Sequence, residues 1–489
     1  MSNIPNVDLR RIVDVYCPSL LRSTWDRIKA SKIGYRLAKG TFWSLLGMVV
    51  SSGLTLVASI LVARLMGKLA YGELGMVRNT MAMFGAVAGL SLGLTATKHV
   101  AEFRLVDPAR AGRVMAFSGM VAFISGALVA IVLCIIAPWL AAHVLAARHL
   151  TGLLRVGCLM LFLEAIAGAQ SGALAGFEAF RSIAQINVIA GLLSFPVLLI
   201  ATYFGGLQGA IWGLTLSSAA KWALGHLALR HEAALAAVPF NFAGWSNEWR
   251  TLWRFSVPST IGGLLSGPVT WACCALLVNR HDGYSEMGIF NAANQWFSAI
   301  LLLPGLLGSV LLPVLAEQLG RKRVTESKRL LGLSVVVNLL IAAPIILLGS
   351  LISPWIMASY GHDFVEGWPT LVVILLTAGL LAAQYPVVQL LTASGRLWEC
   401  MFMNFGWGIT FFVMTWLMVP SGALGLAGAR AVAFLVTAVW SFVLAVSLLR
   451  QTDRQKLEQQ PLEQQEVEQQ GTVDEIIADE ITVACHSSV

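Results

Sequence analysis

Basic side chains lie inside the long apolar stretches of this 489-residue chain, where a charge is costly and usually faces a polar cavity. Those nearest the middle of a stretch are Arg78, Lys221 and Arg430. Two more, Arg155 and Arg254, lie near the ends of stretches, where reaching out to a lipid headgroup is the simpler role. Guanidinium and ammonium groups bind phosphate oxygens. We therefore predict an anionic, phosphate-bearing cargo, with Arg78, Lys221, Arg430 and Arg254 among its binding residues.

Three other polar residues within the apolar stretches are candidates for the same site. Glu164 either forms a charge pair with Lys221 or binds a coupling cation. Asn291 and Asn294 are three residues apart and share one helix face, so they either bind sugar hydroxyls or hydrogen-bond across helices. No spacing of cysteine and histidine resembles a zinc site, so we predict neither a metal nor a cofactor.

These residues must be positioned by membrane-spanning helices. The chain is 57% hydrophobic and only 12% charged, about half the charged share of a soluble protein. A span needs about 20 apolar residues. The sequence predicts about twelve such spans, near 42–63, 73–97, 114–139, 153–175, 183–204, 207–229, 255–278, 287–314, 330–352, 368–392, 401–419 and 424–449. We predict an all-α polytopic membrane protein with two six-helix, pseudo-repeated bundles around a central cavity.

Charge predicts the orientation of these spans. Of the 33 Lys and Arg residues, the predicted external segments hold only Arg64, Lys68, Arg148 and Arg280. Because basic residues gather in cytoplasmic loops, both termini are predicted to be cytoplasmic. The expected location is the bacterial inner membrane, with many passes.

The predicted domains follow from the spans. They are a basic cytoplasmic leader (1–39), an N-terminal bundle (40–230), a cytoplasmic loop between the bundles (231–253), a C-terminal bundle (254–450) and a disordered Gln-rich cytoplasmic tail (451–489). Very short turns at Gly205-Gly206 and Ser421-Gly422 predict tight hairpins. A weak internal repeat supports the two bundles: Gly206-x-x-Gly209-Ala210 recurs as Gly425-x-x-Gly428-Ala429, and Ala101-Glu102 recurs as Ala316-Glu317.

Several short motifs resemble a known family. The first half carries Gly40-Thr-Phe-Trp43, Ala63-Arg-Leu-Met-Gly67, Tyr71-Gly72 and a glycine-rich stretch beginning at Gly89; the second half carries Val257-Pro258 and Gly288-Ile289-Phe290. Over about 40–450 the chain is similar to the polysaccharide-transport (Wzx-type) flippases of the multidrug/oligosaccharidyl-lipid/polysaccharide exporter superfamily. The resemblance implies alternating-access translocation of undecaprenyl-pyrophosphate-linked oligosaccharide repeat units, for exopolysaccharide, capsule or O-antigen biosynthesis.

Two other functions remain as alternatives at this stage. A membrane polysaccharide polymerase would be expected to carry a large external loop, and the external loops here are short. A cation-coupled multidrug exporter of the same superfamily would be expected to carry several membrane-embedded acids, and Glu164 is the one predicted here. We expect a transporter rather than an enzyme. Its expected partners are the lipid-linked glycan, membrane lipids and other polysaccharide-assembly proteins, but not nucleic acid.

Overall fold

The computed structural model describes residues 32–239, 248–249, 256, 265–320 and 324–451, and within these residues it contains helices and turns but no strand. They divide into two compact units. The first contains residues up to Trp296, with Ile352–Leu371 and Phe412–Gly428; the second contains Phe297–Leu351, Val372–Phe411 and the chain from Ala429 onward. Each unit is described by itself.

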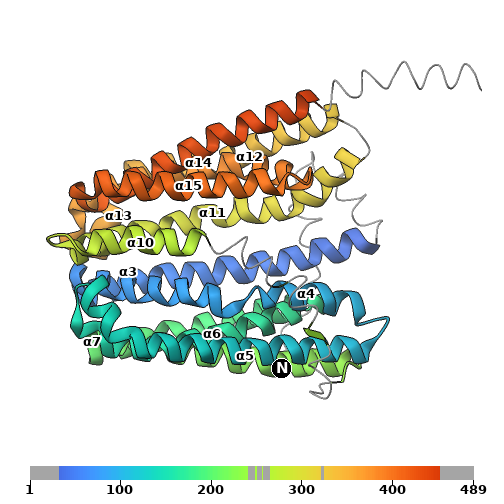
Figure 1. Ribbon diagram of the computed structural model, residues 1–489, viewed down its shortest axis with the longest axis horizontal. Coiled ribbons are helices and arrows are strands. Elements are labelled where there is room, and N and C mark those ends of the chain that lie inside the picture. Colours follow the sequence, from blue (N-terminus) through green and yellow to red (C-terminus); the bar gives the residue numbers. More distant parts are fainter. Residues whose placement is uncertain (1–31, 240–247, 250–255, 257–264, 321–323, 452–489) are drawn as a thin grey trace, which may run out of the picture. The chain divides into compact units, whose positions relative to one another are not determined.

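The first half of the chain forms long helices that are bent back at glycines (Figure 1). These are α3 (Lys32–Gly89), α4 (Leu92–Phe103), α5 (Pro108–Trp139), α6 (Thr151–Gly176) and α7 (Phe180–Leu235). Inside α3 the chain turns at Gly67 (φ 74°), and inside α7 it turns at Gly206 (φ 52°). Because positive φ is costly for residues with a Cβ, glycine lets two spans follow each other with almost no loop. A π-helical turn (Leu140–Val144) and a 3₁₀ turn (Arg148–Leu150) join α5 to α6.

The second half follows the same plan. Its helices are α10 (Ser266–Val278), α11 (Gly283–Gly320), α12 (Val324–Leu351), the short α13 (Ser353–Tyr360), α14 (Trp368–Ala393), α15 (Leu397–Met418) and a final helix over 422–451. The 3₁₀ turn η5 (His362–Gly367) precedes α14. Gly422, with φ 64°, separates α15 and its terminal 3₁₀ turn from the final helix.

The helices confirm the predicted fold class. Seven helical stretches of the described residues are long and apolar enough to cross a membrane. Phe180–Leu235 and Trp398–Gln451 each contain two of the predicted spans, and Gly47–Gly89 contains most of the first two. The hairpin turns at Gly206 and Gly422 are where the sequence predicts them. The second predicted span is interrupted, because Leu90 and Ser91 both take positive φ between α3 and α4.

Small residues let the helices of the first unit pack closely. A Cβ on Gly172 of α6 would overlap the backbone of Gly93 in α4. Next to it, the Thr97 hydroxyl donates to the Gly172 carbonyl oxygen at 2.9 Å. Such close backbone approach, with hydroxyl bonds between helices, is typical of packing in lipid, where the hydrophobic effect does not drive helices together.

Packing in the second unit relies on larger side chains. Leu315, Val387, Leu390, Met403 and Leu448 are buried together in one cluster that joins α11, α14, α15 and the final helix. The amide of Asn338 in α12 donates to the Ala382 carbonyl oxygen of α14 at 3.0 Å. These contacts hold the parts of the second-half helices that belong to this unit.

The hairpin turns correct the register of the internal repeat. A Cβ on Gly209, three residues after the turn glycine Gly206, would overlap the carbonyl oxygen of Ala201. The same overlap occurs between Gly425, three residues after Gly422, and the carbonyl oxygen of Met418. Gly206 therefore corresponds to Gly422, and Gly209 to Gly425. The sequence alignment that paired Gly206 with Gly425 is out of register by three residues, because it matched glycines of different structural roles.

Candidate functional site

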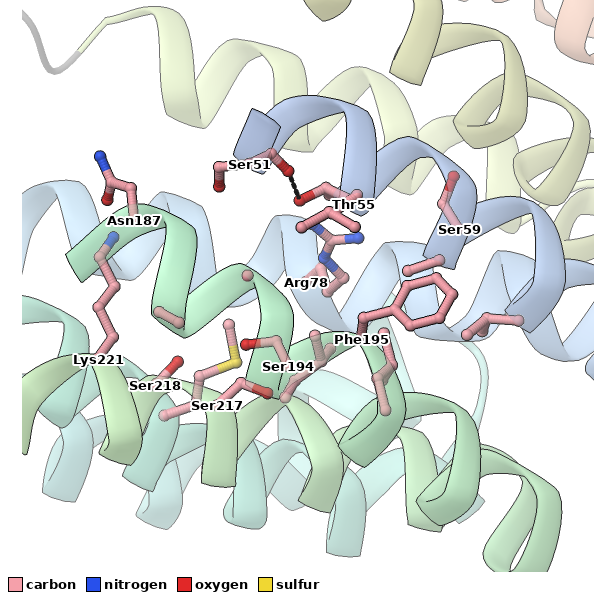
Figure 2. Close-up of a pocket in the computed structure, with 18 of the residues that line it drawn as sticks. Ser51, Thr55, Ser59, Arg78, Asn187, Ser194, Phe195, Ser217, Ser218 and Lys221 are labelled. Atoms are coloured by element: carbon pink, nitrogen blue, oxygen red, sulfur yellow. Dashed lines mark hydrogen bonds between the residues drawn. The ribbon is translucent and has the colours of Figure 1, made fainter. Parts of the chain in front are cut away.

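A polar pocket lies between α3, α6 and α7, within the first unit. It has a volume of about 380 Å³ and is lined by residues from all three helices. Figure 2 shows its labelled side chains converging from α3 and α7 on a shared space. About half of the residues that line it have polar or charged side chains, although the protein as a whole is strongly apolar.

Three charged residues line this pocket: Arg78 from α3, Glu164 from α6 and Lys221 from α7. Arg78 is half-buried, whereas Glu164 and Lys221 are exposed to the pocket or its mouth. In the part of the chain that the structure describes, neither base forms an ion pair, and Glu164 accepts a hydrogen bond from the Ser218 hydroxyl at 3.2 Å. The two bases therefore outnumber the one acid and leave the lining with a net positive charge.

Hydroxyl and amide groups surround these charges. They come from Ser51, Thr55 and Ser59 of α3 and from Asn187, Ser194, Ser217 and Ser218 of α7. Several hydroxyls donate to their own helix, as Thr55 does to the Ser51 carbonyl at 2.9 Å and Ser217 does to the Gly213 carbonyl at 2.7 Å. Their oxygens keep free lone pairs that can accept further hydrogen bonds. In Figure 2 Lys221 extends toward Asn187, and Arg78 lies beside Thr55.

This polar lining has a sequence signal that the prediction overlooked. Ser51, Thr55 and Ser59 are spaced at i, i+4 and i+8, which places them on one face of α3. Ser217 and Lys221 have the same spacing on α7. A polar stripe along an otherwise apolar span predicts a helix face that avoids lipid. Small residues let α3 and α7 approach each other closely, because a Cβ on Gly47 of α3 would lie 2.8 Å from the Cα of Ala184 in α7.

The other predicted site residues lie elsewhere or outside the described residues. Arg430 belongs to the second unit, where its guanidinium carbon lies 3.8 Å from the ring centre of Phe297. Asn291 packs against Gly75 in α3 and does not line the pocket, and Asn294 is half-buried one turn further along α11. Arg155 is exposed in the first turn of α6. Arg254 lies outside the described residues.

The sequence predicts Glu164 as the one acid within a span, and the structure shows that two further acids at the ends of predicted spans are buried or half-buried. Glu73, in α3, is only 8% exposed, and its carboxylate lies 2.7 Å from Nε2 of His149. Glu286, in α11, accepts a hydrogen bond from the backbone N–H of Ala423 at 2.7 Å. Both acids were missed because they stand at the ends of apolar stretches, where sequence alone does not show burial. Burial, together with the negative charge of Glu73, also raises the pKa of the nearby Tyr284 phenol.

The Glu73–His149 pair makes a stability prediction. His149→Ala leaves the buried carboxylate without its partner, and an unsatisfied buried group costs roughly 1–3 kcal/mol. We expect a lower melting temperature for purified His149→Ala protein in detergent. Adding Glu73→Gln removes the buried charge and should recover part of the loss; a double variant less stable than His149→Ala would contradict this account of the pair.

Comparison with known proteins places this architecture in a family. The sequence profile of the family described as "Polysaccharide biosynthesis protein" matches residues 37–319, which is more than half of the chain. The chain belongs to this family. Family membership confirms the resemblance inferred from the motifs and the expectation of a transporter rather than an enzyme. It also covers the three helices that line the pocket.

This family member is similar to curated export proteins of the inner membrane. It is 24% identical over 301 residues to the "EPS I polysaccharide export inner membrane protein EpsE" of Ralstonia solanacearum, a match that covers 58% of this chain. The match spans 66% of the length of EpsE.

Solved structures share the fold of this family member. An inward-facing multidrug resistance MATE family transporter of the MOP superfamily matches with a TM-score of 0.70 and 13% identity, over 84% of this chain and 99% of the other. A MOP superfamily transporter from Pyrococcus furiosus, described as having a binding pocket of reverse polarity, matches with a TM-score of 0.59 and 14% identity, over 86% and 96% of the two chains. At these identities the likeness shows the fold alone.

Proposed function

We propose that this protein exports lipid-linked oligosaccharide repeat units across the bacterial inner membrane by alternating access. The cargo is an undecaprenyl-pyrophosphate-linked glycan destined for exopolysaccharide, capsule or O-antigen. The observation that carries the proposal is that Arg78 and Lys221, far apart in the sequence, line one hydroxyl-rich pocket inside the membrane-spanning helices. Family membership and the likeness to a polysaccharide export protein of the inner membrane support it.

The chemistry of the pocket matches both parts of such a cargo. Pyrophosphate oxygens accept charge-assisted hydrogen bonds from the Arg78 guanidinium and the Lys221 ammonium. Sugar hydroxyls both donate and accept, so the serine, threonine and asparagine side chains of the lining satisfy them in either direction. The lipid tail stays in the bilayer, where no polar group has to be buried. Glu164, through its bond to Ser218, orients the α7 face of the pocket.

The roles of the remaining predicted residues stay predictions. We assign Arg430 and Arg254 to later contacts with the pyrophosphate and Asn291 and Asn294 to contacts with the glycan. Both chain ends are predicted to lie in the cytoplasm. Membrane lipids and other polysaccharide-assembly proteins are the expected partners.

A deletion strain tests the function. Without the exporter, single lipid-linked repeat units should accumulate on the cytoplasmic leaflet, because they are made there and cannot cross. We would measure their sidedness by adding a membrane-impermeant glycan-modifying enzyme to intact spheroplasts and to inverted vesicles. Loss of a membrane polymerase would instead leave single units on the outer leaflet. That result, or normal polymer output from the deletion strain, would overturn the proposal.

A further inference from the structure

Two of the sequence motifs that carry the family resemblance, Tyr71-Gly72 and Gly288-Ile289-Phe290, lie against each other. In the first unit α3 crosses α11 so closely that a Cβ on Gly72 would overlap the carbonyl oxygen of Tyr284. Reciprocally, a Cβ on Gly288 would overlap the carbonyl oxygen of Lys68. We call this contact the glycine crossing: Lys68, Gly72 and Gly75 of α3 against Tyr284, Gly288 and Asn291 of α11.

The glycine crossing is symmetric in sequence as well as in space. The offset that relates the turn glycines Gly206 and Gly422 also relates Lys68 to Tyr284, Gly72 to Gly288 and Gly75 to Asn291. Gly72 contacts Tyr284, and its equivalent Gly288 contacts Lys68, which is the equivalent of Tyr284. Gly75 contacts its own equivalent, Asn291. Contacts of this reciprocal kind occur where a twofold relation passes through an interface. The crossing is therefore where the two repeated halves of the chain meet.

Backbone packing and aromatic rings make this contact tight. Tyr71, next to Gly72, packs against the rings of Tyr360 and Phe364 at centroid distances of 6.5 and 6.1 Å, and all three are at most 3% exposed. At the end of η5, which contains Phe364, a Cβ on Gly367 would overlap the side chain of Ile289 in α11. The contact is thus formed by backbone packing and aromatic rings, without an ion pair between the two helices among the described residues.

The glycine crossing also adjoins the polar pocket. Tyr71, Leu74 and Arg78 line the pocket from α3, so the same three turns of this helix have the pocket on one face and α11 on another. The basic residues of the sequence predict that this end of α3, with Arg64 and Lys68, is external. A cargo that leaves the pocket outward therefore has to pass this contact.

We propose that the glycine crossing is the external gate of the transporter, and that its two faces separate to release cargo and then close again. Flat glycine surfaces can part as rigid faces without unfolding either half, as in rigid-body switching. Separation also hydrates the amide nitrogen of Asn291, which is buried without a partner among the described residues. The proposal rests on the proposed function only for the direction of transport.

A wedge at the gate tests this without the cargo. In a variant free of native cysteines, Ser59→Cys places a reporter thiol in the pocket, where Ser59 is 6% exposed. Adding Gly72→Val overpacks the crossing and should raise the rate of labelling by a membrane-impermeant maleimide, applied outside intact spheroplasts, by about tenfold. The matched control is Gly53→Val on the same helix, where a Cβ meets nothing within 4 Å. If Gly72→Val does not fold, Gly288→Ala is the milder wedge.

A cross-link tests the opposite change. One turn beyond Gly75, the Asn79 amide nitrogen lies 3.8 Å from Sγ of the native Cys274 in α10. In a variant that carries the Ser59→Cys reporter and retains Cys274 as its one native cysteine, Asn79→Cys should form an oxidant-dependent link to Cys274. The link should stop external labelling of the reporter and glycan export, and reductant should restore both. The control adds Cys274→Ala.

Equal labelling of wedge and control variants, or full export by protein shown to be cross-linked, would mean that the crossing is a fixed joint and would overturn the proposal. Export failing while labelling behaves as expected would count against the glycan cargo, not the gate.

Discussion

Replacing Arg78 and Lys221 together by alanine is expected to abolish export while leaving the amount of protein in the membrane unchanged. Both side chains line the pocket, and neither is in an ion pair within the described residues, so their loss strands no buried partner. Each charge-assisted hydrogen bond contributes roughly 1.5–3 kcal/mol. Taking the lower figure for both, because Lys221 is exposed, the double variant loses about 3 kcal/mol, or roughly a hundredfold in affinity for the pyrophosphate.

The measurement is polymer output in a deletion strain complemented by each variant, with membrane levels followed by immunoblotting. Arg155→Ala is the matched control, because Arg155 is an exposed base on α6 that does not line the pocket. Glu164→Gln should retain export, since it removes the one negative charge of the lining. Normal output from the double variant, with the protein present, would exclude the pocket as the phosphate site.

Valine at Gly209 or Gly425 is expected to prevent the protein from accumulating in folded form. At both positions a Cβ would overlap a backbone carbonyl oxygen of the preceding helix, and backbone cannot rotate away as a side chain can. Overpacking of this kind costs about 1–3 kcal/mol even where side chains can adjust. Size-exclusion profiles of fluorescently tagged protein, extracted in detergent, would show the loss of the monodisperse peak.

The control for this prediction is in the same turn. Gly205 directly precedes the turn glycine, yet a Cβ there meets nothing within 4 Å. Gly205→Val should therefore accumulate nearly as well as the unchanged protein. Similar profiles for Gly205→Val and Gly209→Val would show that close approach of the hairpin helices is not what requires glycine there.

The sequence predicts the helices of this protein better than their contacts. Apolar run lengths give the span positions and the hairpin turns at Gly206 and Gly422, and charges within those runs give all three charged residues of the pocket. Lipid imposes both constraints locally. The register of the repeat could not be read, since glycines that turn the chain and glycines that pack helices look alike in a sequence.

The same limit explains the residues that were missed. Glu73 is paired with His149, which lies in a different segment of the chain, and no local sequence pattern predicts such a pair. The meeting of Gly72 with Gly288 likewise depends on how two distant helices cross. By contrast, the four-residue spacing of Ser51, Thr55 and Ser59 does predict a polar helix face. A search of the spans for polar faces as well as for charged residues would have found it.

The contact between Gly75 and Asn291 sets a condition on how the two halves could diverge. Where a residue contacts the equivalent residue of the other half, the space between the helices must hold both side chains. Asparagine at both positions would therefore overlap at this contact in a duplicated ancestor with identical halves. One small and one large residue fit where two large ones do not. Fusion of the copies into one polypeptide permits this inequality, whereas an assembly of two identical chains would have to use the same residue on both sides.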